Sequence, residues 1–244
     1  MQETHLEGRV AVVTGGSRGI GLATAEALVS KGADVVICGR SEASLSEAIE
    51  QIAGRPGAAG PGRAEAFQAD VRDPSQMIGL MERAVERLGR LDILINSAGI
   101  GRFANVTDLT VADWQAVIGT NLSGVFLACH AAVPHLRRSG GGWIINISSL
   151  AGPHPFVGGS AYCASKAGLD ALSEVLMQEL RHDDIRVSCV APGSVDTRFG
   201  ASGDSEAPWK LSVVDVARAV IDLLGHQPRS LPSRVEIRPT RPKK

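Results

Sequence analysis

Short runs of valine, isoleucine and leucine alternate along the chain with longer segments whose apolar residues recur every three or four positions. The short runs are almost continuously apolar, which is typical of strands buried on both faces of a parallel sheet. The longer segments have the period of helices. The expected strands are residues 9–14, 33–39, 64–70, 91–96, 141–148, 184–192 and 233–239, and the expected helices are 21–30, 42–53, 74–88, 111–136, 161–180 and 212–224.

This alternation of strand and helix predicts an α/β fold of the doubly wound Rossmann type, with a seven-stranded parallel sheet and helices on both faces. Ligands of such sheets bind beyond the carboxyl ends of the strands. One linker-like segment, "GRPGAAGPGR" at 54–63, joins a helix to a strand and is too short to separate domains. We therefore expect residues 1–244 to form a single domain with a surface loop at 54–63.

Charge and composition argue against several classes of function. Lysine and arginine number 25 against 26 acidic residues, without a run of like charges, so we expect no nucleic-acid partner. The acidic N-terminus and the lack of an apolar run of about 20 residues predict no membrane association and a cytoplasmic protein. The cysteines and six histidines are scattered without ligand spacing, which predicts buried reduced thiols and no metal. The cysteines are Cys38, Cys129, Cys163 and Cys189.

The stretch "VAVVTGGSRGIG", residues 10–21, fits two kinds of chemistry. Its G-x-S-x-G spacing is that of a hydrolase nucleophile elbow with Ser17 as the attacking group. An elbow of that kind needs an earlier strand whose loop supplies an oxyanion-hole N–H, and here the turn follows the first strand. A hydrolase is therefore the remote alternative.

The second interpretation is a turn that binds phosphate. Gly15, Gly19 and Gly21 allow a tight turn, and a helix beginning at about Ile20 would direct its N–H groups at a pyrophosphate. The spacing G-x-x-x-G-x-G differs from the G-x-G-x-x-G dinucleotide fingerprint, and glycine-rich packing turns also occur. The turn alone leaves both possibilities open.

The end of the second expected strand selects the cofactor. A carboxylate there binds the free ribose of NAD(H), whereas arginine accommodates the 2'-phosphate of NADP(H). The sequence has Arg40 at this place and Arg18 in the glycine turn, which predicts NADP(H). The alternative for Arg40 is a surface ion pair with Glu42.

Tyr162 and Lys166 lie four positions apart on an expected helix and therefore on one face. Tyr162 is the only tyrosine, and a cation about 4 Å from its phenol would lower its pKa of about 10 toward neutrality. Burial opposes that shift, so a cationic nicotinamide is expected to help. Ser149 ends the preceding strand and is a candidate partner of a carbonyl oxygen. Asn121 has poor helix propensity and is a candidate to hold a water beside Lys166.

These motifs together resemble the short-chain dehydrogenase/reductase family over residues 6–224. The resemblance implies a catalytic tetrad of Asn121, Ser149, Tyr162 and Lys166. "TGGSRGIG" resembles the family's cofactor turn and implies contacts from Gly15, Ser17, Arg18, Ile20 and Gly21. Asp70 and Val71 match the adenine-binding pair. "NSAG" resembles the N-N-A-G element with Ser97 replacing its second asparagine, and it contributes Asn96, Ala98 and Gly99. "PGSVDT" resembles the segment around the nicotinamide amide and contributes Pro192, Gly193, Val195 and Thr197.

The resemblance implies reversible hydride transfer between a nicotinamide and a ketone or secondary alcohol. Tyr162 would protonate the oxygen, Ser149 would steady it, Lys166 would hold the ribose and lower the tyrosine pKa, and Asn121 would organise the proton relay. The chain is similar to 3-oxoacyl-carrier-protein reductases. Its ending "SRVEIRPTRPKK" lacks their V-D-G-G segment and resembles NADP-dependent enzymes of small 3-hydroxy acids, which is the alternative activity. A non-catalytic dinucleotide-sensing regulator would not need Tyr162 and Lys166.

Three loops are expected to select the small-molecule substrate: 100–106, 152–159 and a short lid at 198–210. Their candidate lining residues are Phe103, Phe156 and Trp209, and the candidates to meet a substrate carboxylate are Arg102 and Arg198. Ordinary surface-loop roles are the alternative for each. Members of the family pair through their long helices, here 111–136 and 161–180, so we expect a homodimer or homotetramer.

Overall fold

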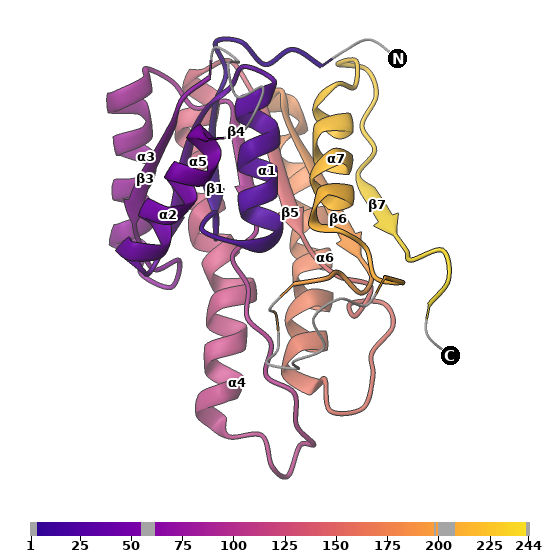
Figure 1. Ribbon diagram of the computed structural model, residues 1–244. Helices are drawn as coiled ribbons and strands as arrows, with labels where there is room; N and C mark the ends of the chain where they lie inside the picture. Colours follow the sequence, from indigo (N-terminus) through magenta and orange to yellow (C-terminus); the bar gives the residue numbers. More distant parts are fainter. Residues whose placement is uncertain (1–3, 55–61, 198, 200–207, 243–244) are drawn as a thin grey trace.

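Seven parallel strands form one sheet in the computed structural model, which describes residues 4–54, 62–197, 199 and 208–242. The spatial order of the strands is β3-β2-β1-β4-β5-β6-β7 (Figure 1). The strands are β1 Val10–Thr14, β2 Asp34–Gly39, β3 Ala64–Gln68, β4 Ile93–Asn96, β5 Gly142–Ile147, β6 Ile185–Pro192 and β7 Arg234–Ile237. The expected doubly wound sheet of seven parallel strands is confirmed, with strand ends close to the expected ones.

The direction of winding reverses at β1. From β1 the chain adds β2 and β3 on one side, and it then returns to place β4 on the other side. Thr14 at the end of β1 lies between Cys38 of β2 and Asn96 of β4. Crevices at such a switch point are where open α/β sheets bind ligands.

Helices cover both faces of the sheet, as expected. They are α1 Gly19–Ser30, α2 Glu42–Ala53, α3 Pro74–Leu88, α4 Val111–Ile118, α5 Gly124–Arg138, α6 Ser160–Leu180 and α7 Val213–Leu224. Alternate strand residues feed two separate cores, because successive side chains of a strand point to opposite faces. Val13 packs in the core with α1, α2 and α7, whereas Val12 packs in the core with α3, α5 and α6 (Figure 1).

The expected helix 111–136 is interrupted. The α4 helix ends at Ile118, a π-helical turn spans Gly119–Ser123, and α5 continues to Arg138. This interruption places the side chain of Asn121 fully inside the protein. π-turns inside helices occur frequently at functional sites, and here the turn carries an expected catalytic residue.

Among the described residues, one helical segment is long and apolar enough to cross a membrane by length and composition. It runs over Val111–Arg138, with a mean hydropathy of 1.6 in its most apolar window. Half of that window is buried inside the protein, where Val125, Ala128 and Ala132 belong to the core beneath the sheet. The apolar character of this segment is thus explained by its packing as a core helix.

Candidate active site

The glycine turn after β1 has the backbone that its sequence predicts. Gly15 and Gly19 have φ angles of 67° and 58°, in the left-handed region that favours glycine. A side chain at Gly21 would collide with the Gly15 carbonyl oxygen, so Gly21 lets the first turn of α1 close directly onto the loop. The helix consequently begins at Gly19, two residues earlier than expected.

The N-terminus of α1 has no side-chain cap. Its N-cap residue is Arg18, whose backbone is extended and whose side chain makes no capping hydrogen bond. The first turn of the helix also contains no acidic residue. In contrast, Ser41, Asp73, Thr110 and Ser212 cap α2, α3, α4 and α7. The N–H groups that begin a helix need acceptors, and an anion such as a diphosphate satisfies them. The N-terminus of α1 therefore fits the phosphates of a dinucleotide.

The loop after β4 packs against the glycine turn. The Thr14 hydroxyl accepts hydrogen bonds from the backbone N–H groups of Ser97 (3.2 Å) and Ala98 (3.3 Å). A Cβ at Gly15 would lie only 2.7 Å from the Cα of Ala98. Two of the predicted cofactor segments thus meet at the switch point of the sheet.

The side chain of Asn96 lies in the interior. Its amide group donates to the Asn146 side-chain oxygen at 2.8 Å and to the Cys129 sulfur at 3.3 Å. These bonds join β4, β5 and α5. Any contact of Asn96 with a cofactor in the crevice therefore falls to its backbone.

The segment after β6 reaches the glycine turn from the other side. The Gly193 N–H donates to the Ile237 carbonyl oxygen of β7 at 2.8 Å, and Val195 forms a parallel bridge with Leu211. Beyond them, a Cβ added at Gly19 would lie 3.7 Å from the methyl group of Thr197. This path carries the expected nicotinamide segment over the start of α1.

The residues expected to contact the adenosine end lie on the β2 and β3 side. Arg18 and Arg40 are exposed, and no ion pair joins Arg40 to Glu42 in the part of the chain that the structure describes. The Asp70 carboxylate binds the Arg72 guanidinium at 2.6 Å, which lowers the pKa of Asp70, and Arg40 adds to this effect. Val71 follows as a buried side chain beneath α5.

Tyr162 and Lys166 lie one turn apart on α6, next to the end of β5. The Ser149 side chain lies beside the Tyr162 phenol and acts to lower its pKa. The Lys166 ammonium lies 5.8 Å from the centre of the Tyr162 ring and donates to the Ile147 carbonyl oxygen at 2.8 Å. Among the described residues this is the only acceptor of the ammonium, so two of its three protons remain available to a ligand.

Burial controls the titration of both side chains. It lowers the pKa of Lys166 from 10.5 to about 8, against the smaller opposing effects of Cys189 and Asp170. Burial also raises the pKa of Tyr162, and the Ser149 hydrogen bond opposes this only in part. The expected lowering of the tyrosine pKa by Lys166 is therefore not found in the cofactor-free protein. The loss of phenolate hydration outweighs a cation that lies against the ring, so Tyr162 is a protonated acid at neutral pH.

The side chain of Asn121 binds protein groups. Its oxygen accepts the Ile100 N–H at 2.9 Å, and its amide donates to the Ile100 carbonyl at 2.9 Å and to the Ser165 hydroxyl at 3.1 Å. Ser165 in turn donates to the Tyr162 carbonyl oxygen at 2.7 Å. Asn121 thus joins the loop after β4 to the α6 turn that carries Tyr162. Both amide protons of Asn121 are thus used within the protein, and its oxygen keeps a second lone pair that can accept a hydrogen bond from a water.

Sequence reasoning missed Asp170, one turn beyond Lys166 on α6. Its carboxylate accepts the Ser148 hydroxyl at 2.5 Å and the Arg234 guanidinium of β7 at 2.9 Å. The Cys189 thiol donates to it at 3.3 Å. The available signal was an acidic residue four positions after Lys166, where a helical neighbour interacts.

The substrate loops bring aromatic rings to Tyr162. The Phe103 and Phe199 ring centres lie 5.6 and 5.5 Å from that of Tyr162, and Phe156 lies 5.8 Å from Phe103. Arg102 instead pairs with Asp113 at 3.2 Å. Arg198 and most of the lid, 200–207, lie outside the described residues.

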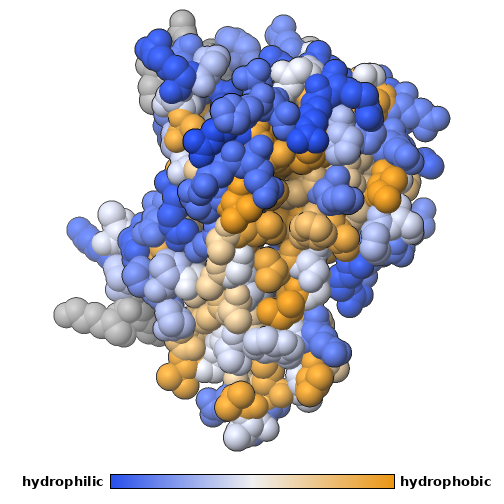
Figure 2. All heavy atoms as spheres, turned by 180° about the vertical axis from the view of Figure 1, so that it is seen from behind, coloured by the Kyte–Doolittle hydropathy of each residue, from blue (hydrophilic) through white to orange (hydrophobic). Residues whose placement is uncertain are grey.

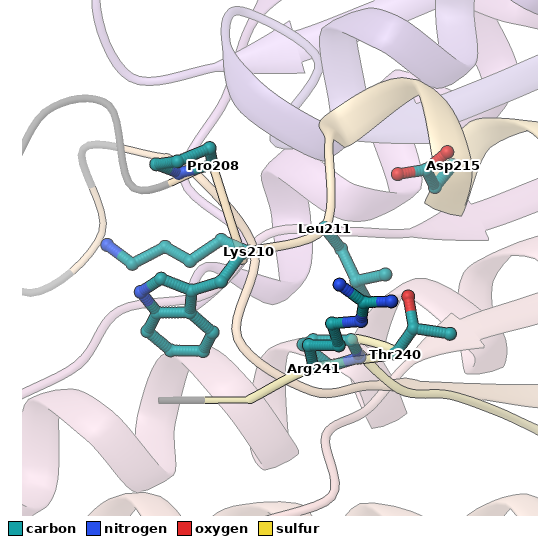
Figure 3. Close-up of a pocket in the computed structure, with 8 residues that line it drawn as sticks. Pro208, Lys210, Leu211, Asp215, Thr240 and Arg241 are labelled. Carbon is teal, nitrogen blue, oxygen red and sulfur yellow. The ribbon is translucent and has the colours of Figure 1, made fainter. Parts of the chain in front are cut away.

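Trp209 lines a different hollow, a pocket of about 430 Å3. Figure 3 shows its two walls, with Lys210 and Leu211 before α7 facing Thr240 and Arg241 of the C-terminal segment. The expectation that Trp209 lines the substrate site together with Phe103 and Phe156 stays a prediction, because this pocket is lined by other residues.

Comparisons with known proteins agree with this architecture. The short chain dehydrogenase family matches residues 9–207. An uncharacterized oxidoreductase, SSP0419 of Staphylococcus saprophyticus, is 35% identical over 96% of this chain and 99% of its own. The 3-oxoacyl-acyl-carrier-protein reductase FabG of Thermotoga maritima is 36% identical over 79% of this chain and 76% of its own. A metagenomic short-chain oxidoreductase solved with NADP has a TM-score of 0.84 and 37% identity, covering 97% of this chain and 99% of its own. The chain belongs to the short-chain dehydrogenase/reductase family of oxidoreductases.

Proposed function

We propose that this protein is an NADP(H)-dependent ketoreductase that transfers hydride between the nicotinamide and a ketone or secondary alcohol. One observation carries the proposal: the Tyr162 phenol, whose pKa burial raises, lies beside Ser149 with the Lys166 ammonium 5.8 Å from the centre of its ring. The same group performs the reverse proton transfer when an alcohol is oxidised. The unpaired, buried cysteines support a cytoplasmic location.

The binding groups of this chain fit NADP(H). The uncapped start of α1 suits the diphosphate, and the exposed Arg18 and Arg40 suit a 2'-phosphate. Lys166 has protons to donate to ribose hydroxyl groups. The similar metagenomic oxidoreductase was solved with NADP. When bound, the cofactor supplies or accepts the hydride.

Side chains of the protein supply the proton, the hydrogen bonds and the ribose contact. Tyr162 gives its proton to the oxygen of the reacting carbonyl, and the Ser149 hydroxyl donates a second hydrogen bond to that oxygen. Lys166 anchors the ribose and stabilises the phenolate that proton transfer leaves behind. Of the two candidates to meet a substrate carboxylate, Arg102 pairs with Asp113 at the surface and Arg198 lies outside the described residues, so small hydroxy acids remain the alternative substrates.

The decisive test replaces Tyr162 by phenylalanine. We expect Tyr162→Phe to lower kcat by about 1000-fold or more, because the proton donor is lost, and to change the Kd of NADPH by less than about threefold. Absorbance of NADPH follows turnover, and fluorescence titration follows binding. Full turnover in this variant would refute the role of Tyr162, whereas loss of NADPH binding would indicate damage to the fold.

Cofactor choice is tested at Arg40. We expect Arg40→Ala to weaken NADPH binding about tenfold or more and to leave NADH binding almost unchanged, because only NADPH has the 2'-phosphate. Arg83→Ala, which removes an arginine stacked on Phe67, is the control for general charge effects. Tighter binding of NADH than of NADPH by the unaltered protein would contradict the assignment.

A further inference from the structure

Four of the nine phenylalanine, tyrosine and tryptophan side chains of the chain lie at one place. The chain contains five phenylalanines and one tyrosine, and three of those phenylalanines form a cluster with the tyrosine. Phe103 meets the Tyr162 ring edge-on at 76°, Phe199 lies tilted at 57°, and Phe103 and Phe199 are 6.5 Å apart. Below, these three phenylalanines are called the ring cluster.

The ring cluster is built from three loops that leave neighbouring strands. Phe103 follows β4, Phe156 follows β5 and Phe199 follows β6. The Ala104 N–H donates to the Gly158 carbonyl at 2.9 Å, which joins the first two loops. A Cβ at Gly101 would lie 2.7 Å from Phe199 and 2.8 Å from Phe103, so only glycine leaves room for both rings.

Each ring keeps a large exposed surface, with 45% of Phe103, 49% of Phe156 and 39% of Phe199 accessible. Two polar residues of these loops have partners outside the cluster. Arg102 binds Asp113, and the His154 ring contacts Arg238 at 3.2 Å. Exposed apolar surface of this kind next to a reacting group is typical of a ligand site, since removing it from water is favourable.

We propose that the substrate is a ketone whose carbonyl carbon bears an aromatic ring, or the corresponding secondary alcohol. This inference rests on the proposed function. Aromatic rings associate edge-to-face or offset with centres about 4.5–7 Å apart, and the tilted ring cluster offers both edges and faces to a further ring. A ring that packs on Phe103 or Phe199 lies near the Tyr162 ring, because both phenylalanines contact that ring. Polyols and small hydroxy acids would find no polar partner in the cluster.

The reaction balances with the proposed cofactor. Reduction of 1-phenylethanone adds a hydride from NADPH to the carbonyl carbon and the Tyr162 proton to the oxygen. The products are 1-phenylethanol and NADP+, and Tyr162 regains its proton from water.

The experiment compares kcat/KM for 1-phenylethanone, butan-2-one and a 3-oxobutanoyl thioester at saturating NADPH. We expect the aryl ketone to exceed butan-2-one about tenfold or more, because the phenyl ring adds buried apolar area at the cluster. We also expect it to exceed the thioester. A smaller preference over butan-2-one, or faster turnover of the thioester, overturns the assignment.

Variants of the ring cluster test whether these phenylalanines cause the preference for the aryl ketone. We expect Phe103→Leu and Phe199→Leu, which keep an apolar side chain, each to lower the aryl-to-alkyl ratio about fivefold or more. Val214→Ala removes an apolar side chain that is 54% exposed on α7, outside the three substrate loops, and it should leave the ratio unchanged. Unchanged ratios in both leucine variants overturn the role of the ring cluster.

A measurement of ketone binding distinguishes failure of this inference from failure of the proposed function. The Tyr162→Phe protein with NADPH is mixed with 1-phenylethanone, and saturation-transfer NMR detects contact of its ring protons with the protein. We expect a signal that weakens in the Tyr162→Phe, Phe199→Leu double variant. If no ketone is reduced but the signal and its loss are seen, the ketoreductase proposal fails and the aromatic site stands. Absence of the signal overturns the aromatic site.

Discussion

Lys166 is a buried cation whose desolvation reduces the stability of the folded chain. Burial lowers its pKa from 10.5 to about 8, which corresponds to about 3 kcal/mol at about 1.4 kcal/mol per pKa unit. Below pH 8 the folded and unfolded chains both carry this charge, and the folded chain bears the full cost. Above pH 10.5 both are neutral. The contribution of Lys166 to stability is therefore gained as pH rises from 8 to 10.5.

Lys166→Met removes this titration. We expect the free energy of unfolding of the variant, minus that of the unaltered protein, to fall by up to about 3 kcal/mol between pH 8 and 10.5. Urea denaturation at several pH values measures the difference. The pKa values of Cys38, Cys129 and Cys189 are raised to about 12, and their effects cancel because both proteins contain them. A difference that does not vary with pH would contradict the buried charge.

Two elements far apart in the chain support the active-site turn of α6. Asp170 of α6 binds Arg234 of β7, and it also accepts the Ser148 hydroxyl at the end of β5. Because its charge raises the pKa of Lys166, Asp170 influences the catalytic lysine as well as the packing. The C-terminal strand is thereby connected to the chemistry of the site.

Asp170→Asn keeps the shape of this side chain but loses its charge. We expect a loss of about 1–2 kcal/mol in stability, below the value for fully buried pairs because Arg234 is partly exposed. The pKa of Lys166 should fall further, so the alkaline limb of the kcat profile should move to lower pH. Glu174→Gln, on the same helix but exposed, is the control for both measurements. Lower stability with an unmoved pH profile would show a purely structural role.

The whole molecule has an apolar face that the monomer does not cover. Phe126 on α5 and Val175 on α6 are about half exposed, and Trp114 on α4 is 41% exposed. Figure 2 shows apolar side chains gathered in a band across this rear face, where Figure 1 places α5 behind the sheet. Such a face is typical of an interface between subunits, and we propose that a second copy of the chain covers it.

A charge on this face should separate the subunits. We expect Phe126→Glu to convert a dimer or tetramer into smaller species, because the carboxylate would be buried without a partner. Size-exclusion chromatography with light scattering measures the mass. Ala43→Glu on α2 adds the same charge at an exposed position on the opposite face of the sheet, and it should leave the mass unchanged. An unaltered protein that runs as a monomer would refute the proposed interface.

Much of this arrangement follows from local patterns. The apolar runs predict the seven strands, because a buried strand needs apolar residues on both faces. Gly15, Gly19 and Gly21 predict the turn that starts α1, since its backbone is accessible to glycine. The spacing of Tyr162 and Lys166 predicts that they share a helix face. Each of these features is complete within a few consecutive residues.

The features of the site that local patterns do not predict depend on contacts between distant segments. The Asp170–Arg234 pair, the grouping of three phenylalanines around Tyr162 and the inward position of Asn96 depend on which loops the sheet order brings together. The raised pKa of Tyr162 depends on how completely those loops exclude water. Local sequence specifies elements and their faces, whereas desolvation and the choice of neighbours exist only after the elements have packed.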